Sequence, residues 1–328
     1  MSVGASRLSI LLLSFFVTPM VVIAGHIDQS VEPIQAIPFK VEVDSRKVEL
    51  GERLFNDTRL SGDNSISCAH CHSLELGGTD AIKHSFGVAG REGPINSPTV
   101  FNSGLNFVQF WDGRALTLED QIEGPIHADK EMDSNWPDII RKLSADAEYR
   151  RDFKSIYQSA ISSDAIKDAI AEFERSLITP NSRFDRYLRG EDAAISRDEE
   201  RGYQLFKEYG CVACHQGASV GGNMYQTFGV MGDYFKDRGQ VTKVDMGRYN
   251  VTGREEDRYL FKVPSLRVVV LTAPYFHDGS TEKLEDAIKV MAKYQLGREM
   301  PKQDIELIIK FLNTLPGEYK GVSLESVD

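Results

Sequence analysis

Residues 68–72 read Cys-Ala-His-Cys-His, and residues 211–215 read Cys-Val-Ala-Cys-His. Both segments follow the C-x-x-C-H pattern of covalent haem attachment, in which two thiols three positions apart bond to one porphyrin as thioethers. The histidine after the second thiol then lies under the iron as its proximal ligand. The sequence therefore predicts two covalently bound haem c groups. The predicted attachment and ligand residues are Cys68, Cys71, His72, Cys211, Cys214 and His215.

Two other uses of these cysteines have to be weighed against haem attachment. Two local disulfides would suit an exported chain, and a zinc site would suit cysteine together with histidine. In a zinc finger, however, the histidine pair is separated from the cysteine pair, whereas here each histidine directly follows a cysteine. Because the two motifs also use all four cysteines of the chain, haem attachment explains the pattern best.

The sequence around the two motifs repeats. Trp111 follows Pro98 by 13 positions. His277 follows Pro264 by the same 13 positions, and both Trp111 and His277 stand between a phenylalanine and an Asp-Gly pair. An ordered match at equal spacing indicates two copies of one haem-binding unit.

Much of the remaining sequence shows helical periodicity. Apolar residues recur at helical spacing in the segments 136–143, 166–177 and 305–312. We therefore predict a mostly α fold, with two cytochrome c-like haem domains in tandem that are related by the internal repeat. The predicted boundaries are 1–24 for a signal peptide, 25–180 for the N-terminal haem domain, 181–198 for the connection and 199–328 for the C-terminal haem domain.

Composition excludes several classes of protein. The chain has 328 residues, of which 27% are charged and 41% are hydrophobic, and this excludes disordered, fibrous and multi-span membrane proteins. Its net charge of −11 argues against a nucleic-acid partner, which would favour a basic face.

The first 24 residues predict the localisation of the chain. Arg7 supplies a positive start, an apolar run follows it, and residues 22–24 resemble a small-residue cleavage site. The run is short and is interrupted by Thr18-Pro19, so a cleaved signal peptide is favoured over an uncleaved anchor. We expect export to a bacterial periplasm, with no stable membrane insertion after cleavage.

The two copies differ where the iron needs its sixth ligand. In the second copy, Met291 lies 14 positions after His277 on a predicted helix. The same offset from Trp111 leads to Pro125, which cannot bind iron. We predict that Met291 ligates the second haem and that the first haem keeps an available distal face. Met291 could instead be a core residue, and the other candidate methionines are Met224, Met231, Met246 and Met300.

The chain resembles the bacterial dihaem cytochrome c peroxidases over nearly the whole predicted mature chain. Besides the haem motifs, the similarity includes GPINSPTVFN at 93–102, QFWDGRA at 109–115 and FKVPSLR at 261–267. The resemblance implies that the chain reduces hydrogen peroxide to water. It also implies a small periplasmic electron donor, either a cytochrome c or a cupredoxin.

The resemblance further implies roles for individual residues. His72 would bind the low-potential peroxidatic haem (haem 1), whereas His215 and Met291 would bind the high-potential haem (haem 2). Trp111 would lie between the haems as an electron conduit, and His277 would contact a haem propionate. The residues implied to line the peroxide side of haem 1 are Gln121 and Glu131, and those implied to bind calcium at the domain interface are Asn96, Thr272 and Pro274.

Elementary chemistry is compatible with these roles. Peroxide cleavage needs a group that moves a proton from one oxygen to the other, and Glu131 is suited to this, with Gln121 as a neutral orienting partner. Backbone and amide oxygens suit a hard cation such as calcium. Taken without the resemblance, Gln121 and Glu131 would be read as ordinary exposed polar residues.

One position departs from the family pattern. Many members carry a histidine that blocks haem 1 until haem 2 is reduced, and the matching residue here is Val88. His84 stands four positions earlier and would need a rearranged loop to replace it. We therefore expect an open haem 1 in the oxidised enzyme, with ligation by His84 as the alternative.

Two other functions compete with peroxide reduction. A related dihaem enzyme oxidises residues of a partner protein and has a tyrosine on its second haem, and Tyr294 keeps that alternative open. A pure electron carrier is the other alternative, and Pro125 argues against it. The sequence does not identify the donor, the haem potentials or the oligomeric state, although a homodimer is one expectation.

Overall fold

The computed structural model describes Met1 and residues 32–325. Apart from Met1, the signal peptide predicted at 1–24 lies outside the described residues. Within the part of the chain that is described, no helix is both long and apolar enough to cross a membrane.

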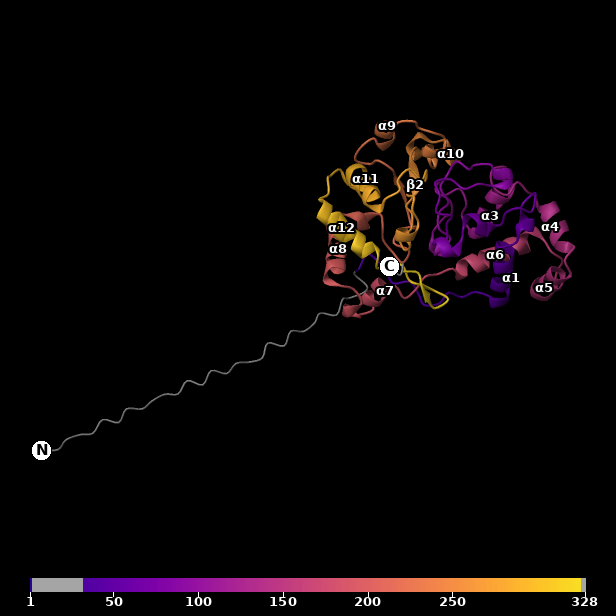
Figure 1. Ribbon diagram of the computed structural model, residues 1–328, viewed down its shortest axis with the longest axis horizontal. Helices are drawn as coiled ribbons and strands as arrows, with labels where there is room; N and C mark the ends of the chain where they lie inside the picture. The colour runs from indigo at the N-terminus through magenta and orange to yellow at the C-terminus, as the bar shows by residue number, and fades with distance from the viewer. Residues whose placement is uncertain (2–31, 326–328) are drawn as a thin grey trace.

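Helices dominate the described chain, which confirms the mostly α fold (Figure 1). The α-helices are α1 (Ser45–Phe55), α2 (Cys68–Cys71), α3 (Leu118–His127), α4 (Trp136–Ser144), α5 (Ala147–Tyr157), α6 (Ser163–Ser176), α7 (Arg183–Leu188), α8 (Arg197–Glu208), α9 (Tyr234–Arg238), α10 (Tyr249–Thr252), α11 (Leu284–Leu296) and α12 (Lys302–Leu312). Strand β1 (Tyr225–Thr227) pairs antiparallel with β2 (Leu260–Lys262), and β3 (Glu318–Tyr319) pairs antiparallel with β4 (Val322–Ser323).

The same helix crossing occurs once in each half. A β-carbon added to Gly51 of α1 would lie 1.9 Å from the carbonyl oxygen of Ala169 in α6. A β-carbon added to Gly202 of α8 would lie 2.0 Å from the carbonyl oxygen of Leu307 in α12. Each glycine therefore lets one helix backbone approach another closely. This matching crossing confirms two tandem units of the same design.

The turns after the haem motifs also repeat in three dimensions. Phe110 and Phe276 both adopt positive φ angles, of 65° and 71°. Isolated antiparallel bridges close the two turns at equivalent positions, Gln109 with Ala115 and Tyr275 with Thr281. The residues between them, Trp111 and His277 included, are thus held in two copies of one turn.

Each half has its own hydrophobic core, and each is completed by a segment from the other end of the chain. The bridge between Ile34 and Gly217 joins residues 32–39 to the C-terminal half, where fully buried Arg267 donates to the carbonyl oxygen of Gln35 at 2.6 Å. At the other terminus, the ring of Tyr319 packs 5.3 Å from that of Phe101 in the N-terminal half. The boundaries 25–180 and 199–328 stay a prediction, and these two terminal segments pack across them.

Candidate functional site

The two haem-attachment motifs lie in short helical turns with free thiols. Cys68 and Cys71 are the first and last residues of α2, and Cys211 opens a 3₁₀ turn that ends at Ala213. None of the four cysteines forms a disulfide, so the disulfide alternative was wrong. His72 Nδ1 lies 3.3 Å from the carbonyl oxygen of Gly78, which leaves its other ring nitrogen for a ligand.

Burial shifts the pKa values of the cysteine and histidine side chains in these motifs. Burial raises the pKa of the Cys68 thiol, with the charge of Glu174 adding to the effect, to about 12. Burial also lowers the pKa of His215 to about 4, so its imidazole is neutral at neutral pH, as an iron ligand must be. His215 Nδ1 is buried without a hydrogen-bond partner among the described residues. The two motifs can therefore each hold a haem c.

Trp111, His277 and Asn96 meet between the two halves. The indole nitrogen of Trp111 donates to the carbonyl oxygen of Asn96 at 3.0 Å. The backbone nitrogen of Asn96 donates to the carbonyl oxygen of His277 at 2.8 Å, and the rings of Trp111 and His277 are 6.4 Å apart. The structure thus brings three predicted site residues, from both repeats, into one contact network.

His277 belongs to a buried ionic network that the sequence did not reveal. Its Nε2 lies 2.8 Å from Oδ1 of Asp245, and Oδ2 of the same carboxylate accepts from Arg238 at 2.7 Å. Arg238 in turn donates to Asp278 at 2.6 Å. Although burial by itself would raise the pKa of Asp245, its bonds to His277 and Arg238 hold that pKa well below its usual range. No sequence motif singled out Asp245 or Arg238.

Asn96, one of the three residues implied to bind calcium, belongs to this junction. Asn96 is buried, and its amide nitrogen donates to the carbonyl oxygen of Ile82 at 3.0 Å, which leaves the amide oxygen as the available side-chain ligand atom. Thr272 and Pro274 follow the 3₁₀ turn Val269–Leu271. Calcium binding at these residues stays a prediction.

Glu131 and Gln121 lie on adjoining segments of the N-terminal half. Gln121 is half-buried on α3, and Glu131 follows that helix. Burial raises the pKa of Glu131, while the charge of Arg114 opposes that rise. Burial raises the pKa of the Cys71 thiol to about 11, and the charges of Asp80 and Glu131 add to that rise. Sequence reasoning missed Arg114, although it belongs to the quoted QFWDGRA motif.

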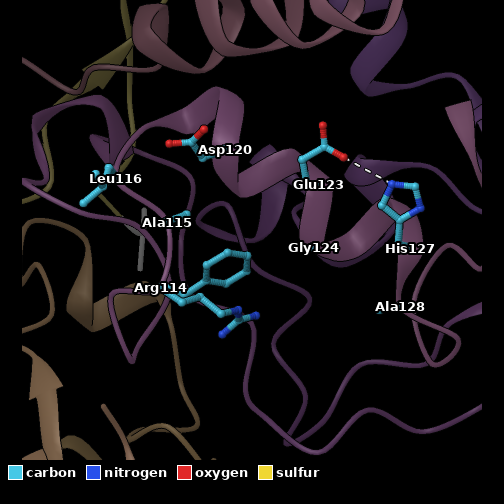
Figure 2. A pocket seen from close by; sticks show the side chains of 9 residues that line it. Arg114, Ala115, Leu116, Asp120, Glu123, Gly124, His127 and Ala128 are labelled. Carbon is cyan, nitrogen blue, oxygen red and sulfur yellow. Dashed lines mark hydrogen bonds and ion pairs between the residues drawn. The ribbon is translucent and has the colours of Figure 1, made fainter. Parts of the chain in front are cut away.

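An open cavity of about 690 Å³ lies along one face of α3 (Figure 2). Its polar lining includes Arg114, Asp120, Glu123 and His127. The guanidinium carbon of Arg114 lies 3.4 Å from the centre of the Phe110 ring, and Glu123 lies 3.2 Å from His127. The lining does not include Gln121 or Glu131.

The candidate ligands of haem 2 have different surroundings. Met291 on α11 packs against an aromatic cluster that Trp111 also contacts. The hydroxyl of Tyr294 donates to Asp237 at 3.0 Å. Among the rival methionines, Met231 is exposed, and Met246 accepts a hydrogen bond from Arg258 at its sulfur. Met291 and Trp111 thus pack against the same aromatic cluster.

Val88, which stands where many family members have the blocking histidine, lies in a loop that is hydrogen-bonded to the segment containing Glu131. Val88 is only 5% exposed, and its backbone nitrogen donates to the carbonyl oxygen of Glu131 at 2.9 Å. Arg91 ties the same loop to Asp133 at 2.5 Å. His84 Nδ1 lies 2.9 Å from Glu92, and its Nε2 is buried without a partner among the described residues.

Comparison with known proteins places the chain in a family. The model of the di-haem cytochrome c peroxidase family matches residues 45–193. The cytochrome c551 peroxidase of Nitrosomonas europaea is 45% identical over 97% of this chain and 93% of its own length, and that of Pseudomonas aeruginosa is 39% identical over 95% and 92%. The cytochrome c peroxidase Ccp of Escherichia coli is 49% identical over 88% of this chain, which spans 62% of that relative's length.

Solved structures agree with these sequence comparisons. A MauG-like protein associated with microbial copper homeostasis superposes with a TM-score of 0.75 at 30% identity, covering 87% of this chain and 93% of that one. A diheme peroxidase variant from Burkholderia thailandensis shows the same fold, with a TM-score of 0.73 at 19% identity over 90% and 94% of the two chains. The chain belongs to the di-haem cytochrome c peroxidase family, whose members are haem-dependent oxidoreductases that act on peroxide.

Proposed function

We propose that this chain reduces hydrogen peroxide to water in the bacterial periplasm, with electrons from a small cytochrome c or a cupredoxin. The observation that carries the proposal is the placement of Glu131. Its carboxyl group is half-buried, and burial raises its pKa against the opposing charge of Arg114. A carboxyl group in such surroundings suits proton transfer close to a haem.

Bound haem would supply the redox-active iron at which the peroxide oxygen–oxygen bond is cleaved. The residues of this chain supply the proton transfers. Ionised Glu131 accepts the proton of the oxygen nearer the haem and returns it to the farther oxygen, which leaves as water. The neutral amide of Gln121 orients the peroxide. Overall, one hydrogen peroxide, two electrons and two protons give two molecules of water.

Electrons would enter through the C-terminal half and cross at Trp111. His215 and Met291 would hold haem 2, with Met291 raising its reduction potential. The network of Trp111, Asn96 and His277 links the two repeats by direct hydrogen bonds, which gives the transfer a rigid path. A calcium ion at Asn96, Thr272 and Pro274 would stabilise this boundary, and a homodimer is a further part of the proposal.

The enzyme would be active in its fully oxidised state. Valine cannot ligate iron, and Val88 is held in place by its bond to Glu131 and by the link between Arg91 and Asp133. His84 is engaged with Glu92. A loop that is docked in this way supports an accessible haem 1 without prior reduction.

Steady-state peroxide turnover with a reduced cytochrome c or cupredoxin tests the proposal. Glu131→Gln should lower turnover about a hundredfold, within the usual range for a proton-transfer group, while both haems stay attached. Glu75→Gln, at an exposed position of the same half, is the control and should keep full activity. Full activity of Glu131→Gln would contradict the assigned role.

A further inference from the structure

Lys262 is a buried lysine whose ammonium group has no hydrogen-bond or ion-pair partner among the described residues. Only 8% of the residue is exposed. Burial lowers the pKa of Lys262, and the negative charge of Asp112 opposes that effect. The carboxylate of Asp112 is itself paired with Arg114 at 2.9 Å. Because burial of most of the side chain disfavours its charged form, an anionic group beside the ammonium would stabilise it.

The internal repeat makes Lys262 the counterpart of Asn96. Lys262 precedes Pro264 by two positions, just as Asn96 precedes Pro98. The backbone confirms the match, because the two residues form reciprocal hydrogen bonds across the repeats. Asn96 N donates to the carbonyl oxygen of His277 at 2.8 Å, and Lys262 N donates to the carbonyl oxygen of Trp111 at 2.8 Å.

The strand that carries Lys262 separates two environments. Phe261, on one face of β2, packs 4.5 Å from the ring of His277, and successive residues of a strand point to opposite faces. Lys262 is therefore on the other face, where it pairs in register with Tyr225 of β1. The hydroxyl of Tyr225 donates to the carbonyl oxygen of Gly113, so this face borders the turn of the first repeat.

We propose that the ammonium of Lys262 binds a haem carboxylate at the boundary between the two repeats. In the first repeat, a cation bound at Asn96 would supply a positive charge at this position. In the second repeat, the ammonium of Lys262 supplies it. The side-chain nitrogen of Gln226, the neighbour of Tyr225 on β1, lies 3.5 Å from Cys214 Sγ, so a haem at the second motif would lie beside this hairpin. Each haem carries two carboxylates. This inference rests on the two haems of the proposed function, but not on the role of Glu131.

A charge pair between Lys262 and the haem has a measurable electrostatic effect. Reduction adds one negative charge to the haem, and a nearby ammonium stabilises that form. Replacement of Lys262 by uncharged methionine, which has a similar length, should disfavour reduction of at least one haem about tenfold. For a one-electron couple this is a fall of about 59 mV in midpoint potential.

Optical redox titration of the purified holoprotein at pH 7 tests the proposal. Lys262→Met should lower at least one haem potential, Lys262→Arg should keep both, and Lys243→Met, at an exposed lysine of the same half, should change neither. If Lys262→Met does not fold, Lys262→Gln gives the same test with a polar neutral side chain. If a neutral variant retains two haems and both haem potentials stay unchanged, the proposal is overturned. Asp112 would then be the partner of the Lys262 ammonium.

Mass spectrometry separates this inference from the proposed function. A wild-type chain without two covalent haems would contradict both. Two haems, a shifted potential in Lys262→Met and full turnover in Glu131→Gln would uphold the lysine site and refute the catalytic role of Glu131.

Discussion

Replacement of Glu174 by glutamine should stabilise the protein in a pH-dependent way. Glu174 lies on α6 and is 6% exposed, and one of its carboxylate oxygens is buried without a hydrogen-bond partner in the described chain. Burial, together with the charge of Glu119, raises its pKa from 4.5 to about 8. Folding therefore opposes ionisation of this side chain.

The sign and size of the effect follow from proton linkage. Below pH 4.5, Glu174 is protonated in both the folded and the unfolded state and contributes no difference. Between pH 4.5 and about pH 8, the unfolded state releases the proton and the folded state keeps it, so stability is lost as pH rises. At about 1.36 kcal/mol per pH unit, the upper limit is about 5 kcal/mol. We expect about half of this, because water that reaches the carboxylate would lower the penalty.

Urea unfolding of the holoprotein between pH 4.5 and pH 9, followed by circular dichroism, measures this effect. The gain in unfolding free energy of Glu174→Gln over wild type should grow up to about pH 8 and then level off. Glu49→Gln, an exposed position on α1, should show no such trend. A difference between Glu174→Gln and wild type that does not change with pH would refute the reasoning.

Three further substitutions test other parts of the structure. Met291→Ala should remove any methionine-to-iron absorption band and lower the potential of haem 2, and an unchanged spectrum would move the assignment to another methionine. His84→Ala should leave the electron spin resonance spectrum of the oxidised protein unchanged and produce no change in lag, whereas conversion of haem 1 from low spin to high spin would show that His84 is a ligand. Gly51→Ala should destabilise the N-terminal half by about 2 kcal/mol in urea unfolding, because its β-carbon would lie 1.9 Å from a backbone oxygen, while Gly93→Ala, at 3.4 Å, should have little effect.

The sequence by itself determined the local chemistry. The spacing within each C-x-x-C-H motif decides which residues hold one haem, because thiols three positions apart on a single turn reach one porphyrin whatever the rest of the fold does. The equal separation of Pro98 from Trp111 and of Pro264 from His277 predicted two copies of one unit. The structure repeats that match in its helix crossings and its turns.

Only the tertiary structure decided which residues meet across the repeats. The bond from Asn96 to His277, the pairing of His277 with Asp245 and the burial of Lys262 each join segments with no regular spacing in the chain. The packing of residues 32–39 on the C-terminal half likewise joins segments that are far apart in the chain. Periodicity and motif spacing report on neighbours along one element, whereas these contacts arise from how separate elements pack, and packing depends on the shape and charge of both surfaces.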